Sequence, residues 1–155
     1  MPSSLPCSSV QNERLRLIVD SYRRLTGKDL LDGIPDRDGA LRVALWNAPR
    51  AIVAHGTEKD DPVFFYGNRL ALELFEMDFP TFARLPSRLS AEPLAQEARE
   101  RLLEKVMRQG YVDGYSGMRI AASGRRFMIA DCTVWNLQDE TGALQGQAAV
   151  FIPQQ

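Results

Sequence analysis

The last third of the chain is the part that most restricts its fold. Residues 117–152 read GMRIAASGRRFMIADCTVWNLQDETGALQGQAAVFI, in which three extended segments are separated by Ser123-Gly124 and by Asp139 to Gly142. Both separators hold the residue types that tight turns between strands require. Successive strands joined by tight turns pair antiparallel. The sequence therefore predicts an antiparallel sheet at this end of the chain.

Two more strands are predicted in the first half, and the second one stops at an asparagine. The run AIVAHG, which starts at Ala51, and the run VFFYG are separated by the acidic turn EKDD, which indicates a hairpin. Asn68 follows directly, and after it come apolar residues at helical spacing. Its side-chain oxygen can accept a hydrogen bond from a free amide of a helix that begins at Arg69 or Leu70. We therefore interpret Asn68 as a structural cap.

Helices are predicted on both sides of this hairpin. The first is preceded by serines that can cap it, ends near Gly27, and carries the apolar stripe Leu15, Ile18, Val19, Tyr22 and Leu25. A second covers residues 40–47, with an extended segment as the alternative. Prolines allow only short helices in residues 78–93. A longer helix opens at Ser90, Glu92 and Pro93 and stops at Gly110, and we expect its inward side chains to be Ala98, Leu102, Val106 and Met107.

This order of elements predicts one α+β domain. A chain of 155 residues is the size of a single domain. Two early strands and three late ones would form a five-stranded antiparallel sheet with helices on one face, preceded by an amphipathic helix. We divide the chain into a flexible tail at residues 1–9, a helical extension at residues 10–49, and the main domain at residues 50–153.

Charge and composition argue against several classes of partner. Nineteen basic and twenty acidic side chains leave a net charge of -1, so neither nucleic acid nor an anionic membrane is an expected partner. Apolar runs fall far short of the roughly 20 residues that a membrane helix needs, so we expect a cytoplasmic protein. Cys7 and Cys132 are expected to be free thiols. His55 is the only histidine, which leaves little from which to build a metal site.

Several motifs resemble a known family. The order of APRAIVAHG, EKDDPVFFYGNRLALELFEM, a long helix and the three late strands is similar to that of a PAS domain, with Asn68 and Ser123-Gly124 at matching positions. More narrowly, SYRRLTGKDLL, LPSRLSAEP and TVWNLQDETG resemble the MEKHLA group of PAS-like proteins, which occur alone or at the C-terminus of homeodomain leucine zipper factors. The Met-Glu-Lys-His-Leu-Ala string that gives the group its name is absent.

The resemblance implies a module for sensing or interaction, and does not imply catalysis. PAS domains hold small ligands between helices and sheet, or pair through the sheet and the N-terminal helix. Haem-binding members usually take the iron ligand from the long helix, but residues 94–109 contain no histidine. Photosensing flavin members carry a reactive cysteine in the middle of the domain, where LPSRLSAEP has none. We therefore expect neither haem nor a covalent flavin, and no other cofactor.

Five polar or aromatic residues are candidates for a ligand site. Arginine suits a carboxylate and tryptophan supplies a flat apolar wall, so the set would fit a small anionic or aromatic ligand. The candidates are Arg88, Ser90, Tyr115, Arg119 and Trp135. The alternative is that Arg88 pairs internally with Glu92 or Glu97 and that the tryptophan only packs.

The N-terminal helix has two interpretations. Its apolar stripe either folds back over the domain or pairs with a second copy, and we favour a homodimer through Leu15, Ile18, Tyr22 and Leu25. We expect a stand-alone sensory or interaction module in signal transduction, whose output passes through an unidentified protein partner. The alternatives are a small isomerase or lyase with a carboxylate of raised pKa in its pocket, and a structural oligomerisation domain with a filled interior.

Overall fold

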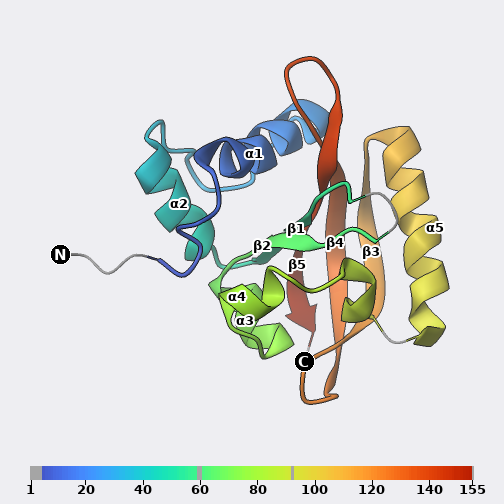
Figure 1. Ribbon diagram of the computed structural model, residues 1–155. Helices are drawn as coiled ribbons and strands as arrows, with labels where there is room; N and C mark the ends of the chain where they lie inside the picture. The colour runs from blue at the N-terminus through green and yellow to red at the C-terminus, as the bar shows by residue number, and fades with distance from the viewer. Residues whose placement is uncertain (1–4, 59–60, 92, 155) are drawn as a thin grey trace.

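A five-stranded antiparallel sheet forms the centre of the molecule (Figure 1). The computed structural model describes residues 5–58, 61–91 and 93–154, and its strands are arranged in the order β2-β1-β5-β4-β3. The predicted α+β class, the hairpin and the antiparallel pairing of the last three strands are confirmed. The strands are β1 (Ala51–His55), β2 (Phe64–Gly67), β3 (Tyr111–Ile120), β4 (Arg126–Gln138) and β5 (Leu144–Gln154).

Six helical segments surround the sheet, and most lie where the sequence predicts them. They are α1 (Asn12–Thr26), α2 (Asp38–Trp46), α3 (Arg69–Phe75), α4 (Phe79–Phe82), the 3-10 helix η1 (Ser87–Ser90) and α5 (Pro93–Gln109). Gly27 ends α1 in the left-handed conformation, as predicted. Glu92 lies outside the described residues. The strand β3 begins at Tyr111 and not near Gly117. Gly110 ends α5 with a φ of 96°, and its carbonyl already accepts a hydrogen bond from the Asn136 amide of β4.

Helices cover both faces of the sheet, and neighbouring residues of β4 show which helix covers which face. Val134 points toward α5, where it lines a cavity together with Leu102. Trp135 points the other way, and its indole N–H donates a hydrogen bond of 3.2 Å to the Ile18 carbonyl of α1. The Trp135 ring also meets the Tyr22 ring edge-on, with centroids 4.8 Å apart. The N-terminal helix therefore lies on the opposite face from α5.

The apolar stripe of α1 is covered by the sheet of its own chain. Leu15, Ile18 and Tyr22 are buried, and Leu25 is partly buried against the same core. These side chains are not free to pair with a second copy. This corrects the prediction that they form a dimer seam, and the fold-back alternative describes the helix.

The segment before α1 is held against the domain. Cys7, predicted to lie in a flexible tail, is fully buried. The Arg42 guanidinium donates hydrogen bonds of 2.6 Å to the carbonyls of Cys7 and Val10. Residues 5–9 are therefore not a flexible tail, while residues 1–4 lie outside the described part. No serine caps α1 either, because its N-cap is Gln11 and makes no side-chain capping bond.

The inward face of α5 differs from the predicted one at a position that matters for function. Leu102 and Val106 are buried as predicted, but Ala98 and Met107 are exposed. Arg99 takes the inward place instead, because residues 99, 102 and 106 share one side of a helix at spacings of three and four. A buried arginine thus faces the sheet where an alanine was expected.

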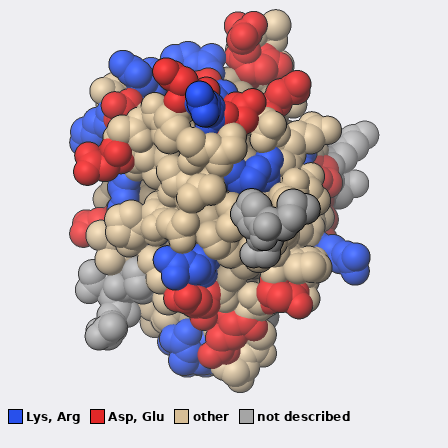
Figure 2. Space-filling view, turned by 90° about the vertical axis from the view of Figure 1, so that its left-hand side faces the viewer, with Lys and Arg blue, Asp and Glu red and all other residues tan. Residues whose placement is uncertain are grey.

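The surface is mixed in charge, in keeping with the composition. Figure 2 shows acidic and basic side chains interspersed among uncharged ones on the face that it presents. None of the described helices is both long enough and apolar enough to cross a bilayer. Cys7 and Cys132 are both buried free thiols, as predicted.

Candidate functional site

A cavity of about 50 Å³ lies between α5 and the sheet. This volume is large enough to admit water or a small solute. Most of its wall is apolar, and its polar members come from five different elements. The lining residues are Val53, Ala54, His55, Phe64, Phe75, Ser90, Arg99, Leu102, Leu103, Arg119, Ile129, Cys132, Val134, Gln147, Ala148, Ala149 and Phe151.

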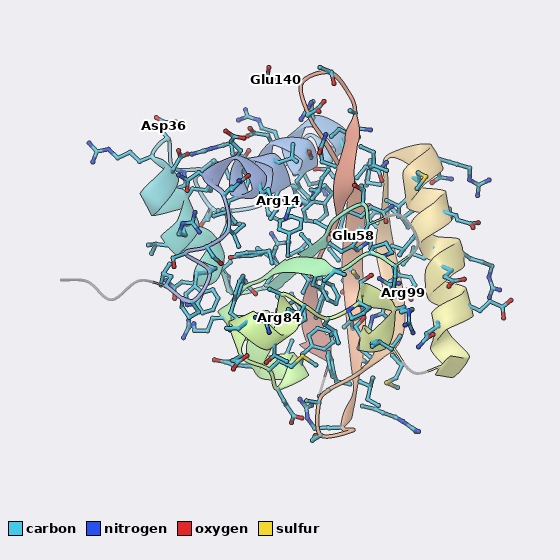
Figure 3. The ribbon with its side chains drawn as sticks, in the orientation of Figure 1. Arg14, Asp36, Glu58, Arg84, Arg99 and Glu140 are labelled. Carbon is cyan, nitrogen blue, oxygen red and sulfur yellow. The ribbon has the colours of Figure 1, made fainter. Side chains whose placement is uncertain are left out.

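Three basic side chains meet at this cavity. Arg99 comes from α5, Arg119 from the end of β3 and His55 from the end of β1. Their residues are only 7%, 8% and 7% exposed. Figure 3 shows Arg99 on the side of α5 that faces the sheet. Burying a basic side chain without a partner costs free energy. A ligand that pairs with these side chains would therefore stabilise the folded protein.

The His55 ring is neutral and presents a buried acceptor. Its Nδ1 lies 2.9 Å from the Gly56 carbonyl oxygen, which can only accept, so Nδ1 carries the proton. Its Nε2 is then an acceptor; it is buried and makes no hydrogen bond of good geometry with a described residue, although the Gln147 side chain lies beside the ring. The pKa of His55 is lowered to about 4, first of all by burial and also by the Arg99 charge, while the Gly56 carbonyl, Glu58 and the Gln147 side chain act in the opposite direction.

This lowered pKa predicts a loss of stability in mildly acidic solution. The folded pKa of about 4 lies below the ordinary value of 6.5, so the unfolded state binds more protons as the pH falls below 6.5. From pH 7 to pH 5, His55 should therefore lower the free energy of unfolding by about 2 kcal/mol. Urea unfolding at each pH checks this, and His55→Gln should remove the slope.

The carboxylates with lowered pKa values affect the free energy of unfolding in a lower pH range than His55 does. Glu76, Asp78 and Asp139 are held low by hydrogen bonds, first of all those from Ser123, Thr81 and Thr141 respectively. Their stabilising effect is present above their ordinary pKa values, near 4, and is lost only as the pH falls below them. An unchanged slope between pH 7 and pH 5 in His55→Gln would contradict the assignment to the histidine.

The two arginines carry charges that nothing else in the cavity wall neutralises. Among the described residues, no aspartate or glutamate lines the cavity. Burial, followed by the nearby charge of Arg119, lowers the pKa of Arg99 to about 10, so it stays protonated at neutral pH. Arg119 donates a hydrogen bond of 2.9 Å to the Met118 carbonyl and lies 5.8 Å from the centroid of the Tyr115 ring.

Of the residues predicted to bind a ligand, the structure brings two to this cavity. Ser90 and Arg119 line it, and the Ser90 hydroxyl donates to the Ser87 carbonyl at 2.8 Å. Tyr115 is half-buried beside Arg119 but is not part of the lining. Trp135 lies on the opposite face under α1, so the alternative of a packing tryptophan describes it.

The fifth candidate, Arg88, is exposed and points away from the cavity wall. It pairs with Asp61 at 3.0 Å, and Glu97, one of its two predicted partners, pairs with Arg101 instead. The sequence interpretation missed Arg99 and the acceptor role of His55. Arg99 could have been found, because it shares a helical face with the two apolar residues that were correctly assigned to the core.

Metal ions have no evident site in the described part of the chain. No group of three or more histidine, cysteine, aspartate or glutamate side chains gathers there. Burial raises the pKa of the Cys132 thiol to about 12, so this cavity residue is a neutral thiol and not a metal-binding thiolate at neutral pH.

Comparison with known proteins assigns the fold and the family. The family model of the MEKHLA domain matches residues 12–154. The chain belongs to the MEKHLA domain family. This MEKHLA domain is 28% identical over 142 residues to the homeobox-leucine zipper protein ATHB-9 of Arabidopsis thaliana. The match covers 88% of this chain and 16% of that protein, so the chain spans about a sixth of the length of this relative.

Solved structures show that the MEKHLA domain has a PAS-like fold. A PAS domain from Colwellia psychrerythraea superimposes with a TM-score of 0.65 at 14% identity, over 75% of this chain and 95% of that one. A PAS domain of a LuxR-family transcriptional regulator from Burkholderia thailandensis, determined in complex with ethanol, superimposes with a TM-score of 0.57 at 18% identity. That match covers 72% of this chain and 95% of the other. The resemblance drawn from the sequence is confirmed.

Proposed function

We propose that this MEKHLA domain is a sensory module that binds a small molecule in the cavity between α5 and the sheet. The observation that carries the proposal is the buried Nε2 of His55, an acceptor on the wall of a cavity that makes no well-formed hydrogen bond with a described residue. Buried polar groups without partners cost stability unless something occupies the site. The similar PAS domain with bound ethanol supports the same use of the fold.

The strand β4 offers a direct route from this cavity to the N-terminal helix. Val134 contacts the cavity, while Trp135, the next residue, holds α1 through the Ile18 carbonyl. The Gln138 amide donates a hydrogen bond of 3.0 Å to the Ser21 hydroxyl, so the end of the strand is tied to the same helix. A ligand that changes the position of β4 therefore changes the packing of α1, as a shift between two populated arrangements.

This route predicts that the exchange of α1 amides depends on cavity occupancy. Protein purified under native conditions from its own cells is compared with the same protein after unfolding, dialysis and refolding. We expect amide exchange in residues 12–26 to be several-fold slower in the occupied protein, because a bound ligand favours the packed arrangement. Hydrogen-exchange mass spectrometry measures this, with α2 as an internal reference.

A second result would contradict the route. If exchange slowed in α5 and β4 but stayed unchanged in residues 12–26, a ligand would bind without reaching the N-terminal helix. Ligand binding in the cavity would then act through a part of the molecule other than α1.

The other parts of the interpretation stay proposals. They are a homodimer, an unidentified protein partner, a cytoplasmic location, and a role without catalysis, haem or flavin. Sedimentation in solution would give the molar mass that tests the homodimer. The oligomerisation alternative predicts a filled interior, and the cavity argues against it. The isomerase or lyase alternative predicts a carboxylate in the pocket, and no acid of the described chain lines the cavity.

A further inference from the structure

The cavity presents more positively charged donors than its protein surroundings use. Among the residues that the structure describes, neither a hydrogen bond nor an ion pair joins Arg99 to another side chain, and the hydrogen bond of Arg119 is the one to the Met118 carbonyl. Each guanidinium carries five N–H donors in a planar fork. The two charges also repel each other, since the charge of Arg119 lowers the pKa of Arg99. An anion between them would satisfy the donors and remove the repulsion.

The same wall holds a buried acceptor whose bonding is incomplete. Because Nδ1 of His55 donates to the Gly56 carbonyl, Nε2 is an acceptor, and it makes no well-formed hydrogen bond with a described residue. An acceptor in this position needs a donor, and a simple carboxylate has none to offer. The rest of the wall near these groups is apolar, with Val53, Leu102 and Phe151 among its members. The arrangement therefore fits a short organic anion that also carries one hydroxyl group.

We propose that the cavity binds a small 2-hydroxycarboxylate of the size of glycolate, whose carboxylate accepts hydrogen bonds from Arg99 and Arg119 and whose hydroxyl donates to the His55 Nε2. The space open to water-sized groups, about 50 Å³, favours a small ligand such as glycolate. This inference rests on the proposed function, since it names the ligand class of the same cavity.

Titration of the full chain with matched solutes tests the ligand class. Protein freed of small molecules by unfolding, dialysis and refolding is titrated with sodium glycolate, sodium acetate and neutral glycolamide at constant ionic strength, and amide resonances are followed by NMR. We expect saturable shifts with glycolate at the ends of β1 and β3 and in α5. Acetate, which lacks the hydroxyl, and glycolamide, which lacks the charge, should each bind at least tenfold more weakly.

Single substitutions assign the roles of the side chains. Arg99→Gln and Arg119→Gln should each weaken glycolate binding at least tenfold. Arg101→Gln is the matched control, because Arg101 is an exposed arginine on the same helix and its replacement should change the affinity less than twofold. His55→Phe should make glycolate and acetate bind equally. The comparison of solutes on the unmodified chain keeps the test valid if a variant does not fold.

Three outcomes would overturn the inference. If glycolamide bound in the cavity and neither carboxylate did, the ligand class would be wrong while the proposed function stood. If Arg101→Gln weakened binding as much as Arg99→Gln, the effect would be one of general charge and not of this cavity. If no solute bound and no small molecule accompanied the natively purified protein, both the inference and the proposed function would fail.

Discussion

Replacing Trp135 with alanine is expected to lower the free energy of unfolding by about 4 kcal/mol. The indole is fully buried between β4 and α1, where it contacts the Tyr22 ring and donates its only hydrogen bond to the Ile18 carbonyl. The substitution leaves a cavity under α1 and a backbone carbonyl without that partner. Urea unfolding followed by circular dichroism measures the change.

A matched variant separates this effect from the general loss of an apolar side chain. Met128 lies on the same strand, and its side chain is exposed, so Met128→Ala should cost less than about 1 kcal/mol. If Trp135→Ala also cost less than that, α1 would not depend on this contact. The proposed route from the cavity to the helix would then have lost its main connection.

Replacing Asn68 with alanine is expected to cost about 3 kcal/mol. The side chain is fully buried, and its oxygen accepts hydrogen bonds of 3.1 Å from the amides of Ala71 and Ile52. Its amide group donates to the carbonyls of Leu45 and Arg50, at 3.1 and 2.9 Å. Loss of the helix cap accounts for about 1 kcal/mol and the buried groups left without partners for the rest.

An exposed asparagine on a helix end provides the control for this prediction. Asn47 donates one hydrogen bond to the Val43 carbonyl in an exposed position, so Asn47→Ala should change stability by about 0.5 kcal/mol or less. The two free energies of unfolding are compared under the same conditions. A similar cost for both variants would mean that Asn68 is no more than a helix cap.

Local signals in the sequence predicted most of the elements correctly, and for one residue they indicated only part of its role. The spacing of Leu15, Ile18 and Tyr22 indicated an amphipathic helix, and its stop at Gly27 is where the structure has it. Asn68 is the predicted cap, but it also ties the start of β1 to the end of α2. The bonds that reach across the fold join residues distant in sequence, so the local pattern around Asn68 does not contain them.

A bulge explains why Trp135 does not line the ligand cavity. Side chains of a regular strand alternate between the two faces, so a strand that places Ile129 on the cavity side would also place residue 135 there. In β4 the register shifts between Ala130 and Thr133, where Asp131 has a φ of 49°. The extra residue reverses the faces, and Trp135 turns to α1. The local sequence pattern does not indicate that the strand faces are reversed.

The buried arginine of α5 was missed for a different reason. Hydrophobic periodicity assigns charged residues to the outer face, and Arg99 stands beside other charged residues of the helix, Glu97 and Arg101. Its spacing from Leu102 and Val106 is a sequence signal for the inward position, but only the structure shows that Arg119 and His55 lie at the same cavity. Sites built from uncompensated buried charge are the places where pattern-based inference is expected to fail.

The central claim is that the cavity under α5 binds a small molecule in the living cell. Native mass spectrometry of the protein purified from its own cells, compared with the same sample after denaturation, tests this claim most directly. We predict a bound mass in the range of a small organic acid that disappears on denaturation and is absent in Arg99→Gln but present in Arg101→Gln. A protein that carries no extra mass in either state, at every purification salt concentration, would contradict the claim.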